Sequence, residues 1–206
     1  KIVIVYCLEN NGPGVARNKG SLFAKSSYLF FLDSGDLSNP HRVNYQLKTL
    51  MKYDVSFGSI KEILPDGESR IKKSSRNLDS AKRILPFRNP YNNVTMAIKK
   101  ESFKKIGGYA NLRTAEDWVL VAKIIKYDFK INSLNEILVD VIPGESFLDR
   151  RTGNHIYLDI KNCLKEIYSM KLMNVFVYFF SLSFQFLIRK IIPKKIISLV
   201  YKYIRN

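Results

Sequence analysis

The sequence predicts an α/β fold, in which helices flank a sheet and a helical segment follows at the C-terminal end. Short runs of β-branched and aromatic residues, typical of buried strands, alternate with helical patterns up to about residue 150. The chain has 206 residues, 46% of them hydrophobic and 13% aromatic, so it can bury a substantial core. Because strands and helices follow one another through short connections, neighbouring strands are expected to pair in parallel.

The first half of the chain begins with a strand pattern. Its opening run, I-V-I-V-Y-C, is rich in β-branched residues, and Val15, Leu22 and Phe23 fall on one side of the next segment if it is helical. Proline is favoured in the first turn of a helix, so Asn39-Pro40 opens a second helix. The elements expected here are a strand at 2–7, a loop at 9–14, a helix at 15–26, a strand at 28–32, a helix from 39 to about 52, a strand at 54–64 and a turn at 65–67.

The second half contains the clearest helix of the chain, at 114–126. There Trp118, Val121, Ala122 and Ile125 recur at helical spacing on one face. The pair Gly107-Gly108 is typical of a helix C-terminus. The other elements expected are a basic loop with a short helix at 71–89, a loop leading into a strand at 89–98, a helix at 101–106, a strand at 137–142, a loop at 149–151 and helices from 155 to the end with a break at Pro193.

The positive net charge of the chain predicts an anionic partner. The formal net charge is +16 and the pI is about 9.8, which indicates nucleic acid, an acidic membrane surface or a phosphorylated substrate. From Lys161 onward nine basic residues face a single acid, Glu166, so about half of the excess lies in the last quarter. These bases stand beside aliphatic and Phe-rich segments rather than in a base-stacking pattern, which disfavours nucleic acid.

Two segments place polar residues where open α/β sheets bind ligands. Residues 12–20 read G-P-G-V-A-R-N-K-G, a turn leading into a helix, and residues 28–36 read Y-L-F-F-L-D-S-G-D, a buried strand ending in acids. Ligands of open α/β sheets bind at the carboxyl ends of strands. Carboxylates such as Asp33 and Asp36 are the ligands that Mg²⁺ or Mn²⁺ prefers. For each aspartate alone, a turn that closes the strand is the structural alternative.

Both segments, with their spacing, resemble the family 2 glycosyltransferases of the GT-A fold, which has a Rossmann-like mixed sheet with flanking helices. Members carry G-P-x-x-A-R-N-x-G and then F-L-D-S-D-D, the segment that holds the metal of a nucleotide-sugar. The resemblance implies that Arg17 and Asn18 lie on the donor side and that Asp33 and Asp36 hold Mg²⁺ or Mn²⁺. Gly35 stands where the family has a metal-binding carboxylate, so metal binding is expected to be weakened or lost unless Asp36 substitutes from the next position.

The acidic pair at the start of the helix at 114–126 resembles the family's E-D motif. The resemblance implies that Asp117 is the catalytic base, with Glu116 beside it. Adjacent carboxylates raise the pKa of one member, which suits a base. The structural alternative is a capping box with Thr114 as N-cap, because acids are favoured in a first helical turn.

Two further blocks resemble family segments. Residues 88–95 read R-N-P-Y-N-N-V-T and are similar to an R-N-P-x-N-H-x-T block of bacterial polysaccharide transferases, with Asn93 in place of the usual His. Asn93 and Thr95 are therefore expected on the acceptor side, and Trp118 of the helix at 114–126 is expected there as well. Arg150 and Arg151 resemble an R-R loop near the donor diphosphate, for which arginine is suited by its bidentate geometry; a solvated basic loop is the alternative.

The C-terminal segment combines aromatic residues with positive charge. Residues 172–188 are uncharged but include Asn174, Ser181, Ser183 and Gln185, and bases follow at Arg189-Lys190 and Lys194-Lys195. Such a composition favours an interfacial helix whose five Phe side chains (Phe176, Phe179, Phe180, Phe184 and Phe186) enter an anionic membrane surface. A membrane span and ordinary packing on the catalytic domain are the alternatives.

The resemblance covers the later part of the family's domain, because the strands that bind uracil and ribose in other members have no counterpart here. We therefore expect residues 1–154 to be the C-terminal portion of a GT-A catalytic domain and residues 155–206 a membrane-associating tail. The expected activity is inverting transfer from a nucleotide-sugar to a lipid-linked or polysaccharide acceptor, in capsule, O-antigen or exopolysaccharide synthesis, peripheral on the cytoplasmic face of a bacterial inner membrane. A catalytically inactive, membrane-attached binding remnant is the alternative.

Overall fold

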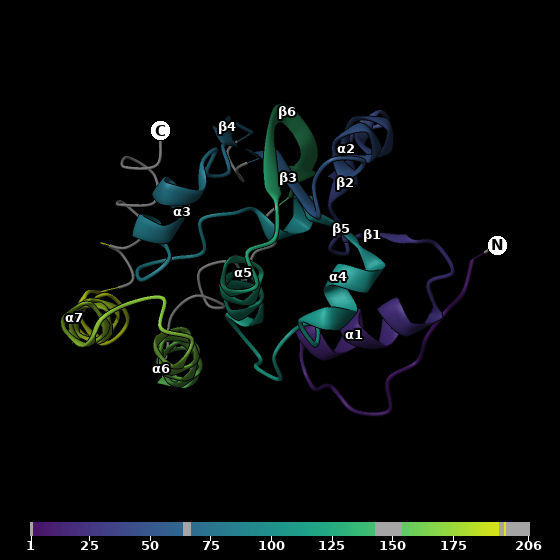
Figure 1. Cartoon of the computed structure of the whole chain (residues 1–206). Coiled ribbons are helices and arrows are strands. Elements are labelled where there is room, and N and C mark those ends of the chain that lie inside the picture. Colours follow the sequence, from purple (N-terminus) through teal and green to yellow (C-terminus); the bar gives the residue numbers. More distant parts are fainter. Residues whose placement is uncertain (1, 64–66, 143–153, 194–195, 197–206) are drawn as a thin grey trace.

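A computed structural model describes residues 2–63, 67–142, 154–193 and 196. Its centre is a mixed sheet in the order β1-β5-β3-β6-β2, with β4 paired to β3, and Figure 1 shows helices on both sides of it. The strands are β1 (Tyr28–Phe30), β2 (Leu37–Ser38), β3 (Val55–Ile63), β4 (Ser69–Lys72), β5 (Ala97–Lys99) and β6 (Ile131–Val141). The helices are α1 (Pro13–Phe23), α2 (Arg42–Leu50), α3 (Leu78–Ile84), α4 (Lys100–Lys105), α5 (Glu116–Lys126), α6 (Asn154–Ser169) and α7 (Val175–Phe186), with a short 3₁₀ helix η1 (Asn93–Thr95) and a short π-helix η3 (Leu187–Ile191).

The expectation that neighbouring strands pair in parallel is wrong for β1. β1 and β3 run in the same direction, but β5 lies between them and pairs antiparallel with both. Among the described strands, parallel pairing occurs between β3 and β6, where Val55 faces Ile131 and Glu62 faces Val141. β5, which comes later in the chain, therefore lies between β1 and β3, which are closer to each other in sequence.

The predicted strand at 2–7 is not formed. These residues have no strand partner within the described chain, and Ile2, Ile4 and Tyr6 are exposed. A β-branched run forms a strand only when another strand pairs with it, because its backbone N–H and C=O groups otherwise keep their hydrogen bonds to water. β1 pairs with β5 on one side and is an edge strand of the described sheet.

One hydrophobic core extends from the sheet into the C-terminal helices. α5 is buried over most of its length, with Trp118, Leu120 and Ile124 in this core. α6 adds an apolar stripe to the same cluster, consisting of Ile156, Ile160, Cys163, Leu164 and Ile167. The predicted boundary after residue 154 therefore does not separate two hydrophobic cores, because α6 packs as part of the main unit.

Candidate active site

Arg17 joins two acidic residues from distant parts of the chain. Its guanidinium Nη2 lies 2.5 Å from Asp33 Oδ1, just after β1, and its Nη1 lies 2.6 Å from Glu116 Oε1, at the start of α5. The Glu116 side chain is buried and the Arg17 side chain is largely so. The structure thus brings the A-R-N segment, the strand-end acid and the acidic pair together.

Gly14 allows α1 to approach α5 this closely. A Cβ at this position would lie 2.8 Å from Glu116 Cγ and 3.1 Å from the carbonyl oxygen of Ala110. Gly14 is also buried. The glycine before the A-R-N segment is therefore explained by the room it leaves for the side chain that Arg17 binds.

Asn18 holds the loop that follows α4. Its Nδ2 donates to the carbonyl of Tyr109 at 2.9 Å, and its Oδ1 accepts from the Tyr109 amide, also at 2.9 Å. Gly108 leaves space for this contact, since a Cβ there would lie 2.4 Å from Asn18 Oδ1. Both polar groups of the amide are thus used in positioning the protein backbone.

Tyr109 connects the donor-side and acceptor-side predictions. The guanidinium of Arg17 lies over its ring, 5.2 Å from the centroid, and its hydroxyl donates to Asn93 Oδ1 at 3.0 Å. Burial raises the pKa of Tyr109 above its ordinary value. Sequence reasoning did not name Tyr109 as a site residue, although its position directly after Gly107-Gly108 was a signal.

Asn89 holds the predicted base. Its Nδ2 donates to Asp117 Oδ2 at 3.0 Å, while its own Oδ1 accepts from the Tyr91 amide at 3.0 Å. Among the described residues, Asn89 is the one hydrogen-bond partner of the Asp117 side chain, which leaves Oδ1 for a ligand. Asn89 was also missed as a site residue, although it lies in the R-N-P-Y-N-N block.

Thr114 does not cap α5. The residue before the helix is Ala115, in a left-handed conformation with φ 63°, and makes no side-chain cap. The amide and hydroxyl of Thr114 donate instead to Asp159 Oδ2 of α6, at 3.0 and 2.9 Å. The acidic pair is thus positioned by a contact between α6 and this loop, not by a capping box.

The three residues predicted on the acceptor side, Asn93, Thr95 and Trp118, are all buried. Trp118 is 5% exposed, and its indole Nε1 donates to the carbonyl of Leu85 at 2.8 Å. Thr95 is fully buried and donates to the Asn92 carbonyl at 2.7 Å. The polar groups of Trp118 and Thr95 are thus satisfied within the protein. These two side chains support the loops around the site from the interior.

The pKa of the Glu116 carboxyl is raised to about 7 in spite of its ion pair with Arg17. Burial raises the pKa of this carboxyl above its ordinary value, and the nearby charge of Asp117 raises it further, while Arg17 acts in the opposite direction. Glu116 and Asp117 therefore occupy different environments on one helical turn, and Glu116 is the one bound to the guanidinium.

The described residues do not by themselves form a metal site. Asp33 Oδ1 is bound to Arg17, and Asp36 Oδ1 accepts from the Ile142 amide at 3.4 Å, toward the end of β6. Gly35 has φ 92° and no side chain to contribute. Within the described ranges no group of three or more acidic, His or Cys residues is placed to hold an ion. Arg150 and Arg151 lie outside the described residues.

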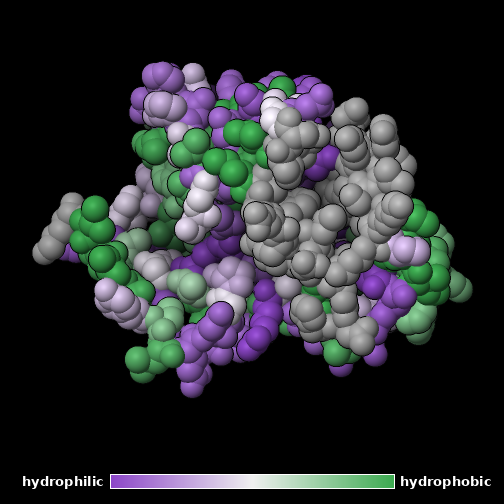
Figure 2. Space-filling model, turned by 180° about the vertical axis from the view of Figure 1, so that it is seen from behind, coloured by the Kyte–Doolittle hydropathy of each residue, from purple (hydrophilic) through white to green (hydrophobic). Residues whose placement is uncertain are grey.

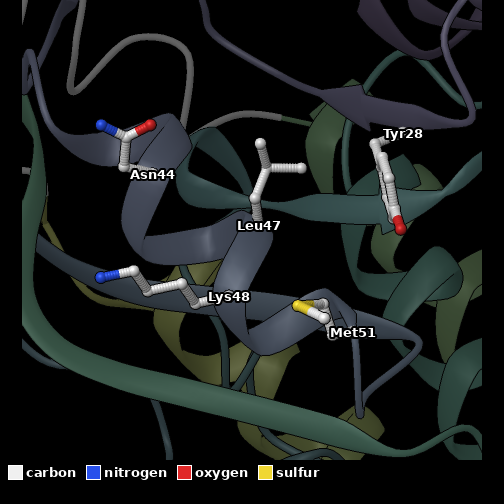
Figure 3. Close-up of a pocket in the computed structure, with 5 residues that line it drawn as sticks. All are labelled: Tyr28, Asn44, Leu47, Lys48 and Met51. Atoms are coloured by element: carbon white, nitrogen blue, oxygen red, sulfur yellow. The ribbon is translucent and has the colours of Figure 1, made fainter.

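A surface hollow lies beside α2, and its lining does not include these carboxylates. It has a volume of about 370 Å³ and is lined by Tyr28, Asn44, Leu47, Lys48 and Met51, between α2 and the edge strand β1 (Figure 3). None of the predicted site residues lines it. The candidate site is thus defined by its side chains rather than by this hollow.

Comparison with known proteins identifies the class. The profile of glycosyl transferase family 2 matches residues 1–107, about half of the chain. The chain belongs to this family. The expected GT-A fold, a mixed sheet with flanking helices, is confirmed by its solved structural neighbours.

Three of these relatives show the range of the similarity. The amylovoran biosynthesis glycosyltransferase AmsE of Erwinia amylovora is 23% identical over 98% of this chain and 76% of its own length. A UDP-Gal:alpha-D-GlcNAc-diphosphoundecaprenol beta-1,3-galactosyltransferase of Escherichia coli is 30% identical over 79% of this chain and 58% of its own. The structure of S. aureus TarS 1–349 with UDP-GlcNAc matches with a TM-score of 0.59 at 18% identity, over 86% of this chain and 53% of its own. The chain thus spans roughly half to three quarters of these relatives.

Proposed function

We propose that the protein transfers a sugar, with inversion, from a nucleotide-sugar to a lipid-linked or polysaccharide acceptor in the synthesis of a bacterial surface polysaccharide. Family membership supports the transferase class. The names of the relatives supply the substrate types: one uses UDP-Gal and a diphosphoundecaprenol-linked acceptor, and another acts in amylovoran biosynthesis. The observation that carries the proposal is the Arg17 bridge between the strand-end Asp33 and the Glu116-Asp117 pair.

In the proposed reaction Asp117 is the base. Its carboxylate takes the proton of the acceptor hydroxyl as that oxygen attacks the anomeric carbon. The new carbon–oxygen bond forms on the face opposite the nucleoside diphosphate, whose bond to the anomeric carbon breaks as it leaves with the electron pair. Inversion follows from this single displacement. Asn89 orients Asp117 through its 3.0 Å hydrogen bond, which helps to keep the base in a productive geometry.

Arginine side chains are proposed to balance the charge of the diphosphate. Arg17, which pairs with Asp33 and Glu116, is proposed to lie on the donor side of the site. Arg150 and Arg151 are proposed to reach the phosphates, where the bidentate geometry of arginine suits phosphate oxygens. Since the described residues do not fit a metal, no step is assigned to one, and we propose that dependence on Mg²⁺ or Mn²⁺ is weakened or lost through Gly35.

The proposed location is the cytoplasmic face of the bacterial inner membrane, as a peripheral protein. A lipid-linked acceptor and the net charge of +16 support contact with an anionic membrane surface, and nucleic acid is not proposed as a partner. Among the described helices, none combines the length and apolar character needed to cross a bilayer.

The test is sugar transfer by the full-length protein. Asp117→Asn should lower turnover by about 100-fold or more while the protein stays folded, and Asp79→Asn, in the first turn of α3, is the matched control. The anomeric configuration of the product, read by NMR, should be opposite to that of the donor. Retained turnover in folded Asp117→Asn, or retention of configuration, would contradict the proposal.

A second candidate is a catalytically inactive, membrane-attached binding module. Gly35 favours it, because a family carboxylate is replaced by a residue without a side chain. Calorimetry separates the two functions. Donor binding by the unmodified full-length protein without release of nucleoside diphosphate, in the presence of varied acceptors, would establish the binding module.

A further inference from the structure

The burial pattern of α7 is inverted relative to an ordinary surface helix. Its fully buried residues are the polar Ser181 and Gln185. Gln185 Nε2 donates to the carbonyl of Phe87 at 2.7 Å, in the loop after α3. Surface helices normally bury their apolar stripe and expose their polar one. Here Ser181 and Gln185 face the protein, beside the partly buried Tyr178 and Leu182, which pack against the core.

The outward side of α7 is aromatic. Phe176, Phe179 and Phe180 are 83%, 61% and 64% exposed, and we call these three residues the α7 face. Further exposed apolar residues continue it along the helix and into η3: Val175, Phe184, Phe186, Leu187 and Ile191. Figure 2 shows hydrophobic surface at the margin of the molecule where α7 lies.

The helix that carries this face is firmly attached to the protein. The ring of Phe87 meets Phe180 and Phe184 edge-on, at centroid distances of 6.0 and 5.9 Å. Tyr178 of α7 also stacks on Tyr168 of α6, with their ring centroids 4.9 Å apart. The exposure of the α7 face is therefore a property of a packed helix.

The charges around α7 complement an anionic surface. α7 itself carries no charged residue, and exposed Lys171 precedes it while Arg189 and Lys190 follow in η3. Exposed Lys161 and Lys165 lie on the neighbouring α6. Aromatic side chains favour the membrane interface, and bases near the surface are attracted to anionic headgroups. With 12 residues, α7 is about 18 Å long, which is shorter than the hydrocarbon core of a bilayer, about 30 Å thick.

We infer that the α7 face docks into the interfacial layer of an anionic lipid bilayer, with Phe176, Phe179 and Phe180 among the acyl chains and the flanking bases at the headgroups. This assigns residues to the membrane contact of the proposed function. It does not depend on the transfer reaction, because the contact needs neither donor nor acceptor. In this orientation α7 fixes which side of the molecule faces the bilayer.

The experiment is flotation of the full-length protein with phosphatidylcholine vesicles, with and without phosphatidylglycerol. We expect binding to the anionic vesicles, weakened by salt because the Debye length falls from about 10 Å at 0.1 M to about 3 Å at 1 M. The double variant Phe176→Ser/Phe179→Ser should lower the partition coefficient at least about tenfold. Both side chains are exposed, so the fold should persist, which circular dichroism checks.

The matched control is Leu22→Ser/Phe23→Ser, which changes two exposed apolar residues at the end of α1. This control should bind vesicles as the unmodified protein does. Equal binding by the α7 variant and the unmodified protein would overturn the inference. So would a concentration-dependent dimer, seen by analytical ultracentrifugation, that the α7 variant abolishes without any change in flotation, because the face would then bind a second copy of the chain.

Discussion

Gly14→Ala tests the close contact that holds the candidate site together. In an open helical position this change stabilises a protein by about 0.5–1 kcal/mol. At Gly14 the new Cβ would lie 2.8 Å from Glu116 Cγ and 3.1 Å from the Ala110 carbonyl oxygen. Such overpacking costs about 1–3 kcal/mol. The contact outweighs the helical gain, so we expect a net loss of about 0.5–2 kcal/mol of unfolding free energy.

Gly20→Ala is the matched control for this prediction. Gly20 lies in the same helix, and a Cβ there would meet nothing within 4 Å. This variant should therefore gain about 0.5–1 kcal/mol. Urea denaturation of both variants, followed by circular dichroism, gives the two free energies. If Gly14→Ala is as stabilising as Gly20→Ala, α1 does not approach Glu116 tightly enough to exclude a methyl group.

Three further predictions address the pH dependence, the metal and the support of the acidic pair. The raised pKa of Glu116 means that its contribution to stability, present below its ordinary pKa of 4.5, is lost as the pH rises through the raised value. Glu116→Gln should thus make the unfolding free energy less dependent on pH above 4.5. If urea denaturation gives both proteins the same dependence of this free energy on pH, the prediction is refuted. Gly35→Asp should tighten Mn²⁺-dependent binding of a nucleoside diphosphate in the full-length protein, measured by calorimetry; equal metal dependence before and after would mean that Asp36 already serves as the ligand. Asp159→Ala removes the acceptor of two hydrogen bonds from Thr114 and should cost about 1–3 kcal/mol in urea denaturation, whereas an unchanged midpoint would show that this link contributes nothing.

Local periodicity was sufficient to predict many of the individual elements. The spacing of Trp118, Val121, Ala122 and Ile125 predicted α5, and all four side chains are buried. β6 was predicted only at 137–142, whereas it runs from Ile131 to Val141. Its first half is partly exposed and lacks an apolar pattern, and it becomes a strand because β3 supplies hydrogen-bond partners from Val55 onward. Pairing between distant segments is not visible in local composition.

The residues of the candidate site could be named from the sequence, but their connections could not. Arg17, Asp33 and Glu116 each stand in a recognisable segment, yet Arg17 and Glu116 are 99 positions apart. Asn89 was passed over because its partner Asp117 is 28 positions away. The roles of these side chains depend on distances of about 3 Å, which only the packing of α1 against α5 and of the following loops determines.

The sequence by itself determined the family, the class of fold and the positive charge of the C-terminal segment, because motifs, short-range periodicity and composition are properties of the chain alone. The tertiary structure decided that residues 2–7 have no strand partner, that α6 belongs to the main core, and that α7 turns Ser181 and Gln185 inward and its phenylalanines outward. The physical reason is that burial of apolar surface is non-directional. Which face of a largely apolar helix is covered depends on the partner that packs against it, here Phe87 with its carbonyl and ring.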